Sequence, residues 1–129
     1  MPNRPLVAIV DDDESHRRAT QSLLRSAGYA TAVFGDAESF LSSTNRASTA
    51  CLVSDLRMPG MSGLELYEAL IASGQHIPTV LVTAYAEELT RLQALKAGVT
   101  CFLGKPFAAD DLLECICKAL AQPEPEPEP

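Results

Sequence analysis

Five polar side chains of types that suit phosphoryl transfer occur where short apolar runs of the sequence end. A carboxylate can attack phosphorus, whereas a hydroxyl group and an amine can donate hydrogen bonds to phosphoryl oxygens. Neighbouring carboxylates can hold the divalent cation that such chemistry uses. The five residues are Asp11 and Asp12 after residues 6–10, Asp55 after residues 50–54, Thr83 after residues 77–82, and Lys105 after residues 99–103. They predict phosphoryl transfer if the fold brings them together.

The four consecutive acids at residues 11–14 form the densest part of this pattern. Carboxylates packed at the end of a buried strand repel one another unless a cation lies among them. Oxygen ligands of this kind favour a hard divalent ion, Mg²⁺ before Ca²⁺. Asp13 and the two residues after it also suit the start of a helix, through capping and the helix dipole. That alternative explains Asp11 and Asp12 poorly, so we expect these two residues to bind a metal ion.

Short apolar runs alternate with segments of helical periodicity. The expected strands are residues 6–10, 29–34, 50–54, 77–82 and 99–103. The expected helices are residues 15–27, 36–41, 63–72, 87–97 and 110–121, with a polar loop over residues 42–49. Such alternation with short connections predicts an α/β fold, a single (βα)5 doubly wound domain with a five-stranded parallel sheet. The strands' carboxyl ends then share one edge, where the five polar residues meet.

Several other residues have simpler interpretations. Gly28 and Gly98 are expected to end helices. Apolar residues recur at helical spacing in the last two helices. They are Leu89, Leu92 and Leu95 in one, and Leu112, Leu113, Ile116 and Leu120 in the other. Exposed positions are expected for two histidines and three arginines, namely His16, His76, Arg17, Arg18 and Arg25.

Composition excludes several classes of function. The chain has 129 residues, 47% of them hydrophobic, which suits one domain with one core. Its net charge of −7 argues against direct binding of nucleic acid or of an anionic membrane. No apolar run approaches the roughly 20 residues of a membrane span, and the start lacks a secretory apolar segment.

Four cysteines occur without the spacing of a zinc site. Cys51, Cys101, Cys115 and Cys117 are expected to be small buried hydrophobes in a reducing cytoplasm.

Proline and glutamate alternate at the end of the chain, over residues 123–129. Residues 122–129 are expected to form an extended polyproline II segment, about 3.1 Å per residue and so roughly 25 Å long. We expect this segment to be a spacer that leads to an output domain after Pro129. The alternative is a frayed, solubilising tail.

The motifs resemble the receiver domain of two-component response regulators, over residues 5–121. The matching stretches are Val10-Asp11-Asp12-Asp13, Asp55-Leu56-Arg57-Met58-Pro59-Gly60-Met61-Ser62-Gly63, Val82-Thr83-Ala84 and Lys105-Pro106-Phe107. The residues of these motifs are most similar to those of the FixJ/LuxR-type regulators, which carry a helix-turn-helix DNA-binding domain after the receiver. The resemblance implies a flavodoxin-like sheet with strand order 2-1-3-4-5.

The resemblance also implies roles for the five residues. A sensor histidine kinase would pass its phosphoryl group to Asp55. Mg²⁺, with Mn²⁺ as the alternative, would be bound by Asp11, Asp12, Asp55 and the backbone carbonyl of Arg57. Lys105 and Thr83 would contact phosphoryl oxygens. The protein would act in signalling and would catalyse only its own phosphotransfer and dephosphorylation.

A conformational switch is implied as well. Thr83 would move toward the phosphoryl group, and Phe102 would turn inward to fill the vacated space. The face formed by the fourth helix, fifth strand and fifth helix would change and support a phosphorylation-dependent homodimer. DNA would be reached only through a following output domain, no membrane is involved, and the location is cytoplasmic. The family also predicts a cis peptide bond between Lys105 and Pro106.

Two residues depart from the commonest pattern of the family. Tyr85, two residues after Thr83, is bulky enough to slow the attack of water on a phosphoaspartate. Arg57, two residues after Asp55, can shield or pair with the phosphoryl group. Both are therefore expected to modulate the lifetime of the phosphoryl group.

Two alternatives remain. Residues 11–15 fit the Asp-x-Asp-x-Ser outline of haloacid-dehalogenase-type phosphohydrolases, in which Asp11 would be the nucleophile, but this leaves Asp55 and its loop unexplained. The second alternative is an interaction module that keeps the fold and takes no phosphate. Such a module usually lacks one of the acids, the threonine or the lysine, and all are present here.

Overall fold

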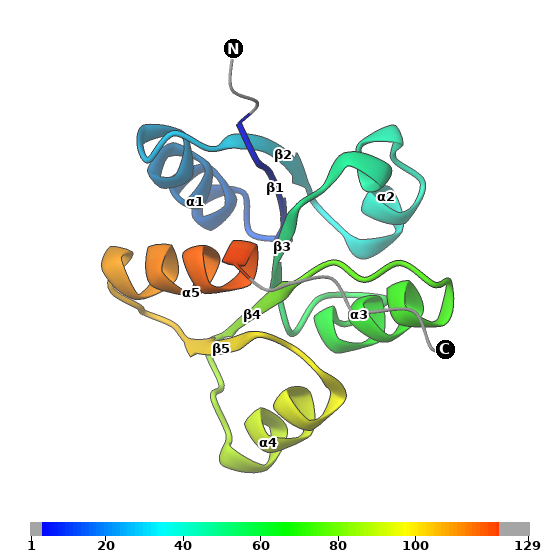
Figure 1. The fold of residues 1–129 in the computed structure, drawn as a ribbon. Coiled ribbons are helices and arrows are strands. Elements are labelled where there is room, and N and C mark those ends of the chain that lie inside the picture. Colours follow the sequence, from blue (N-terminus) through cyan, green and yellow to red (C-terminus); the bar gives the residue numbers. More distant parts are fainter. Residues whose placement is uncertain (1–3, 122–129) are drawn as a thin grey trace.

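The computed structural model describes residues 4–121. Within these residues, five strands alternate with five α-helices (Figure 1). The strands are β1 (Leu6–Val10), β2 (Ala30–Phe34), β3 (Cys51–Asp55), β4 (Thr79–Thr83) and β5 (Cys101–Gly104). The helices are α1 (Glu14–Ser26), α2 (Ala37–Leu41), α3 (Gly63–Ala72), α4 (Glu88–Ala97) and α5 (Ala109–Ala121), with a 3₁₀ helix, η1, at Thr44–Ser48.

The strands form one parallel sheet in the order β2-β1-β3-β4-β5, which confirms the predicted topology. Helices α1 and α5 cover one face, and α2 and α3 cover the other (Figure 1). The central strands β1, β3 and β4 are almost wholly buried, as their unbroken apolar runs predict. The more mixed strand β2 lies at an edge, where Val33 is exposed.

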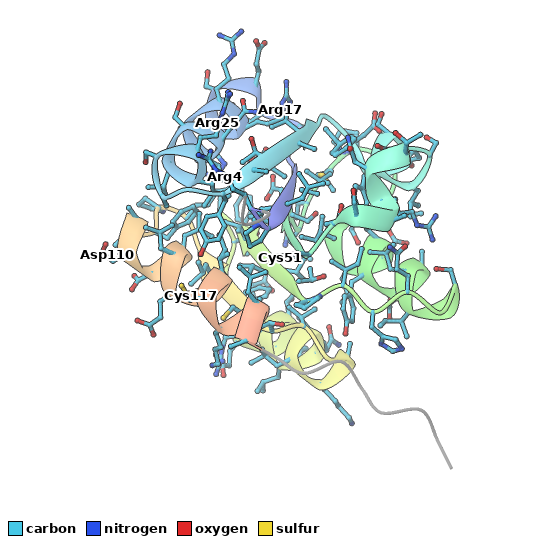
Figure 2. All side chains as sticks on the ribbon, turned by 45° about the horizontal axis from the view of Figure 1, so that its top comes forward. Arg4, Arg17, Arg25, Cys51, Asp110 and Cys117 are labelled. Atoms are coloured by element: carbon cyan, nitrogen blue, oxygen red, sulfur yellow. The ribbon has the colours of Figure 1, made fainter. Side chains whose placement is uncertain are left out.

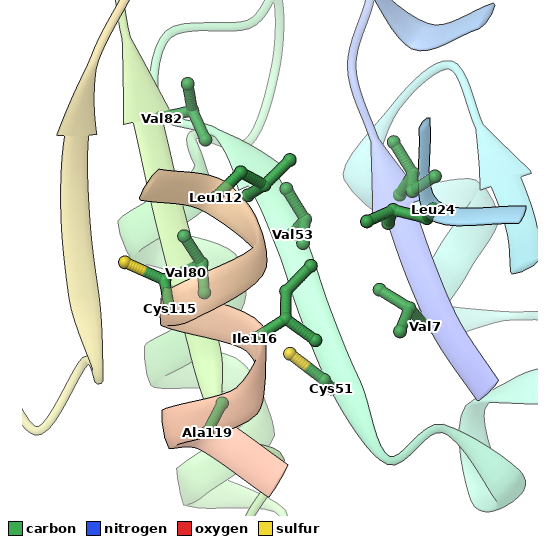
Figure 3. Packing of buried hydrophobic residues seen from close by; sticks show 11 residues of the cluster. Val7, Leu24, Cys51, Val53, Val80, Val82, Leu112, Cys115, Ile116 and Ala119 are labelled. Atoms are coloured by element: carbon green, nitrogen blue, oxygen red, sulfur yellow. The ribbon is translucent and has the colours of Figure 1, made fainter. Parts of the chain in front are cut away.

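The core has separate layers on the two faces of the sheet. On one face, Leu112 and Ile116 of α5 pack with Val53, Val80 and other residues of the central strands (Figure 3). On the other face, Phe40 of α2 and Leu66 and Leu70 of α3 pack against β1 and β3. A third cluster joins α3 to α4 and contains Leu56, Tyr67, Leu81, Ala94 and Val99. These layers hold the strands in register, so the carboxyl ends of β1, β3, β4 and β5 meet at one edge.

The structure shifts some predicted boundaries. Asp55 and Thr83 are the last residues of their strands and do not follow them. The predicted loop over residues 42–49 contains η1, whose cap is Ser43, with a side chain that accepts a hydrogen bond from the Asn45 N–H (3.0 Å). Gly28 and Gly98 both have positive φ, 98° and 114°, which fits their predicted place at helix ends.

The prediction that all four cysteines are buried is wrong for one of them. Cys51 and Cys115 are buried, Cys101 is partly buried, and all four are free thiols. Burial raises the pKa of the Cys51 thiol to about 12. Cys117 is exposed on α5 (Figure 2), because side chains two positions apart on a helix, such as those of Cys115 and Cys117, point in roughly opposite directions.

None of the helices in the described part of the chain has the length and apolar character that crossing a membrane requires. The extended segment predicted for residues 122–129 lies outside the described residues.

Candidate functional site

Three carboxylates meet at the carboxyl edge of the sheet. Asp11 and Asp12 follow β1, and Asp55 ends β3. Each offers one carboxylate oxygen, and these oxygens all lie within 4.8 Å of one another. Asp11 is buried and Asp12 is exposed, so the group is open to solvent on one side. An all-oxygen set of this kind fits a hard divalent cation such as Mg²⁺, as the sequence predicts.

A glycine allows the chain to close tightly behind Asp55. The N–H of Gly63, the first residue of α3, donates to the carbonyl of Leu56 (2.8 Å). A Cβ at Gly63 would overlap the carbonyl oxygen of Asp55. The next turn is fixed by a reciprocal capping box between Ser62 and Glu65. The loop after Asp55 is therefore anchored at the start of α3.

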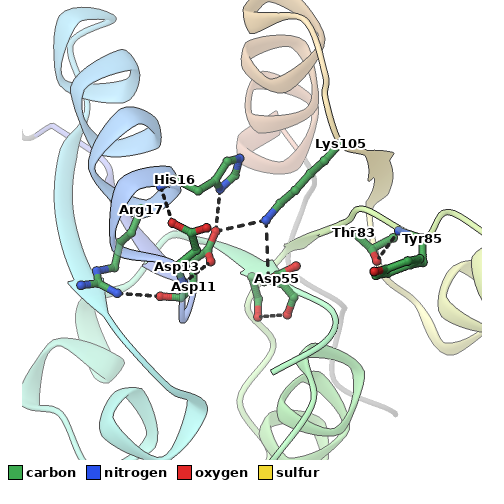
Figure 4. A network of polar contacts seen from close by, with 9 residues as sticks. Asp11, Asp13, His16, Arg17, Asp55, Thr83, Tyr85 and Lys105 are labelled. Carbon is green, nitrogen blue, oxygen red and sulfur yellow. Dashed lines mark hydrogen bonds and ion pairs between the residues drawn. The ribbon is translucent and has the colours of Figure 1, made fainter. Parts of the chain in front are cut away.

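Lys105 lies between two of the carboxylates. Its Nζ is 3.5 Å from Asp55 Oδ2 and 3.4 Å from Asp11 Oδ2, and its side chain is only 18% exposed (Figure 4). The backbone N–H of Lys105 donates to the carbonyl of Thr83 (2.7 Å), which ties the loop after β5 to the end of β4. The peptide bond between Lys105 and Pro106 is cis, as the family resemblance implies.

The electrostatics of Asp55 combine opposing effects. Burial raises the pKa of the Asp55 carboxyl group, and the negative charges of Asp11 and Asp12 raise it further. The Lys105 ammonium group opposes both effects through its charge and a hydrogen bond. The Lys105 ammonium group is therefore a neighbouring cation that favours the ionised form of Asp55.

Thr83 and Phe102 lie on the same side of the sheet. The register pairs Leu81 with Phe102 and Thr83 with Gly104, and side chains two positions apart on a strand share a face. Thr83 is 1% exposed, and its Oγ1 accepts a hydrogen bond from the Tyr85 N–H (3.1 Å). Phe102 is partly buried against the cluster that joins α3 to α4. Both predicted switch residues therefore adjoin the same layer of the core.

Arg57 and Tyr85 contact each other. The Arg57 guanidinium carbon lies 4.7 Å from the centre of the Tyr85 ring, and its Nη2 is 3.2 Å from Glu87 Oε1. Tyr85 is 62% exposed. The Arg57 side chain therefore bridges the loops after β3 and β4, and Glu87, which precedes α4, is a partner that the sequence did not indicate.

Two residues of α1 that were predicted to be exposed contact Asp11 instead. His16 Nδ1 lies 2.6 Å from Asp11 Oδ2, and Arg17 Nη1 donates to the carbonyl of Asp11 (2.8 Å) (Figure 4). Both are partly buried. Side chains in the first turn of a helix point back toward its N-terminus. This rule could have indicated from the sequence that His16 and Arg17 lie near Asp11. His76 is exposed, as predicted.

Asp13 caps α1 beside these contacts. Its side chain accepts a hydrogen bond from the N–H of His16 (3.1 Å), and this contact is the main reason that the pKa of the Asp13 carboxyl is lowered. The backbone N–H of Asp13 in turn donates to Asp11 Oδ1 (2.9 Å). Of the four consecutive acids, Asp13 is therefore a capping residue, as the alternative interpretation of the acidic stretch had it.

Comparison with known proteins identifies relatives across most of the chain. Residues 7–117 match the model of the response regulator receiver domain. Nodulation protein W of Bradyrhizobium diazoefficiens is 38% identical over 116 residues, which are 90% of this chain and 51% of that protein. The transcriptional regulatory protein FixJ of the same organism is 36% identical over 124 residues, 96% of this chain and 60% of that protein. The chain thus spans about half of these relatives' length.

Solved structures agree with the sequence relatives. The structure of FixJ-N superposes with a TM-score of 0.86 at 33% identity, covering 98% of this chain and all of that one. The response regulator StyR superposes with a TM-score of 0.84 at 44% identity, covering 92% of this chain and 60% of that one. The likeness extends over the whole sheet and its helices.

Proposed function

Because the chain belongs to the response regulator receiver domain family, we propose that it accepts a phosphoryl group on Asp55 in two-component signal transduction. The observation that carries this proposal is the meeting of Asp55 with two further carboxylates and Lys105 at one edge of the sheet. This arrangement supplies a nucleophile, a place for a cation and a positive charge for phosphoryl oxygens.

The donor in this proposal is a phosphohistidine of a sensor histidine kinase. An Asp55 carboxylate oxygen forms the new P–O bond while the P–N bond of the donor breaks. The electron pair of that bond returns to the imidazole nitrogen, which takes up a proton. The reaction needs ionised Asp55, and the Lys105 ammonium group, 3.5 Å away, favours this form against the effect of burial.

The proposed metal ligands are Asp11, Asp12, Asp55 and the backbone carbonyl of Arg57. The first three fit a divalent cation by their spacing. The ion is Mg²⁺, with Mn²⁺ as the alternative, and when bound it neutralises part of the charge on phosphoryl oxygens. Asp11 is the most enclosed of the three carboxylates, since its side chain is 5% exposed.

Lys105 and Thr83 are proposed to contact the phosphoryl oxygens, and Thr83 and Phe102 to form the switch. The Thr83 hydroxyl group accepts the Tyr85 N–H and keeps its own hydrogen for a phosphoryl oxygen. A shift of Thr83 opens space in the layer where Phe102 packs. The face made by α4, β5 and α5 then changes and supports a homodimer.

Arg57 and Tyr85 are proposed to modulate the lifetime of the phosphoaspartate. Their contact places a cation and an aromatic ring together on the loops that follow β3 and β4. The ring limits the access of water, and the guanidinium group can exchange Glu87 for a phosphoryl oxygen.

The wider setting is proposed from the relatives. Residues 1–121 form the receiver, and residues 122–129 link it to an output domain that binds DNA and controls transcription. FixJ is named a transcriptional regulatory protein, and this chain covers 60% of it. The receiver works in the cytoplasm with a sensor histidine kinase. It catalyses only its own phosphotransfer and dephosphorylation.

Intact-mass measurement after incubation with acetyl phosphate and Mg²⁺ tests the proposal. We expect one added phosphoryl group on the wild type, and none when Mg²⁺ is chelated. The matched variant is Asp55→Asn, which keeps the shape of the side chain and removes the nucleophile.

Two results would contradict the proposal. If Asp55→Asn still gains a phosphoryl group that Asp11→Asn loses, the chain is a phosphohydrolase-like protein with Asp11 as nucleophile. If the wild type gains no group and forms no beryllofluoride adduct, the fold serves docking alone.

A further inference from the structure

His16 bridges two loops of the site. The residue lies in the first turn of α1, and its Nδ1 is 2.6 Å from Asp11 Oδ2. The ring also packs edge-on against Phe107, with centroids 5.8 Å apart and planes at 90°. Phe107 follows Lys105 and Pro106 in the loop after β5. His16 therefore connects the loop after β1, which carries Asp11, with the loop that carries Lys105.

The direction of the hydrogen bond follows from chemistry. An ionised carboxylate can only accept hydrogen bonds, so Nδ1 of His16 carries the hydrogen and donates it to Asp11. The separation of 2.6 Å is slightly shorter than the roughly 2.7–2.9 Å of charge-assisted N–H···O hydrogen bonds. The other oxygen, Oδ1, accepts the N–H of Asp13 (2.9 Å). Both oxygens of this buried carboxylate thus have a donor even without Lys105.

Lys105 is held more loosely by the same carboxylate. Its Nζ lies 3.4 Å from Asp11 Oδ2 and 3.5 Å from Asp55 Oδ2, longer than the His16 contact. When the proposed phosphoryl group forms on Asp55, Lys105 has to turn toward it. If His16 did not donate to Asp11 Oδ2, this movement would leave a buried carboxylate oxygen without a hydrogen-bond donor. The free-energy cost of that unpaired oxygen would oppose the movement of Lys105.

We propose that His16 is a positioning residue that keeps the Asp11 carboxylate hydrogen-bonded and oriented while Lys105 moves to the phosphoryl group. The inference rests on the proposed function and adds a residue to it. His16 acts through Asp11 and does not touch the reacting atoms. The removal of a residue that hydrogen-bonds to a metal ligand typically lowers metal affinity or activity by roughly 10- to 100-fold.

Three substitutions separate the donor from the ring. His16→Phe keeps a flat ring beside Phe107 and removes the donor. His16→Asn places an N–H group at the position of Nδ1, whereas His16→Gln places one further out, near the position of Nε2. The ring borders a hollow of about 520 Å³ that Ala19, Leu23, Pro106 and Phe107 also line, so each substitution has room. Circular dichroism establishes that every variant is folded.

The rate of phosphorylation by acetyl phosphate, followed by intact mass at fixed Mg²⁺, is the first measurement. We expect His16→Phe and His16→Gln to react about tenfold more slowly than the wild type, and His16→Asn to recover most of the rate. Equal rates in the wild type and His16→Phe, or equal recovery by Asn and Gln, would overturn the proposal.

Nuclear magnetic resonance gives a second readout that does not depend on turnover. The Nδ1–H signal of His16 should resist exchange with solvent in the free protein and in the complex with Mg²⁺ and beryllofluoride. His76→Gln assigns it, because the chain has two histidines. Loss of this signal in the complex would overturn the proposal. A wild type that takes no phosphoryl group would overturn the proposed function and this inference together, whereas an equal rate in all variants would overturn the inference alone.

Discussion

The two helices that flank β5 differ sharply in how they are held. Helix α5 buries Leu112, Cys115, Ile116 and Ala119 against the sheet. Helix α4 buries Ala94 alone, while two of its leucines, Leu89 and Leu92, are 68% and 51% exposed. Local stability follows buried apolar contact, so α4 is expected to open more readily than α5. We therefore expect the helix on one side of β5 to be more rigid than the helix on the other.

This difference fits separate roles for the two helices in the proposed switch. The loop that carries Lys105 leads directly into α5, and a fixed helix keeps that loop in place. Helix α4 follows the loop of Tyr85 and Glu87. Both residues contact Arg57, and the Tyr85 N–H donates a hydrogen bond to the Thr83 hydroxyl oxygen. A change at Thr83 can therefore shift α4 at small cost while the rest of the core stays as it is.

The largest effect is expected from truncating the anchored helix. Ile116 is fully buried between α5 and the sheet (Figure 3), so Ile116→Ala leaves a cavity and should lower the free energy of unfolding by about 2–5 kcal/mol. Urea unfolding measures the change. Glu114→Ala, at an exposed position on the same helix, is the matched control and should be nearly neutral. A loss below about 1 kcal/mol for Ile116→Ala would mean that α5 is not the anchor we infer.

A smaller loss of stability is expected from a substitution at the C-terminal end of α4. Gly98 has φ of 114°, and a Cβ there would lie 2.5 Å from the hydroxyl oxygen of Tyr67 on α3. Gly98→Ala should cost about 1–2 kcal/mol of backbone strain, with an added contribution from the contact with Tyr67. Gly74→Ala is the control, because Gly74 has φ of 84° with no atom within 4 Å of a Cβ. If both variants lose the same stability, the close packing of Tyr67 against Gly98 adds nothing to the cost of the substitution.

Most of the fold was predictable because burial leaves a clear pattern. Unbroken apolar runs marked β1, β3 and β4 as central, and the bounds of α3 agree with the prediction. The burial of α4 was not predictable. Its leucines recur at helical spacing just as those of α5 do, but spacing alone does not tell which stripe faces the sheet. The small Ala94 makes the close contact instead.

The site was predictable as a set of positions, and less so as a set of contacts. Parallel topology brought Asp11, Asp12, Asp55 and Lys105 to one edge, as expected. Side-chain direction decided the rest. His16 turns back toward Asp11, and Arg57 turns to Tyr85 and Glu87, although the sequence suggested an exposed residue for the first and a phosphoryl partner for the second.

A third prediction uses the site to separate the two helices. Burial and the charges of Asp11 and Asp12 raise the pKa of Asp55 in the folded state. The folded state therefore binds this proton more tightly, and the stability that it contributes is lost as pH rises through the raised pKa. At neutral pH, Asp55→Asn removes the unfavourable burial and charge repulsion of the Asp55 carboxylate. The melting temperature should therefore rise, by less than the preceding variants lower it.

Hydrogen exchange then distinguishes global from local opening in Asp55→Asn. Amides of α5 that exchange through global unfolding should become slower, and amides of α4 that exchange through local opening should not change. Equal slowing in both helices would show that α4 opens only with the whole domain. Wild-type protein with Mg²⁺, which relieves the same repulsion, should behave in the same way.

The smallest effect on stability is expected at the exposed leucines. Leu89→Gln with Leu92→Gln removes apolar side chains that are already mostly in water, so the free energy of unfolding should change by no more than about 0.5 kcal/mol per site. The same variant should weaken dimer formation by the beryllofluoride complex, measured by sedimentation, because two neighbouring leucines form the apolar part of the proposed α4–β5–α5 contact. A clear loss of stability would mean that α4 depends on these leucines for its attachment. Unchanged stability with unchanged dimerisation would place the contact elsewhere, whereas unchanged stability with a weaker dimer would show that α4 keeps its leucines exposed for a partner and is held to the sheet by Ala94 and its C-terminal end.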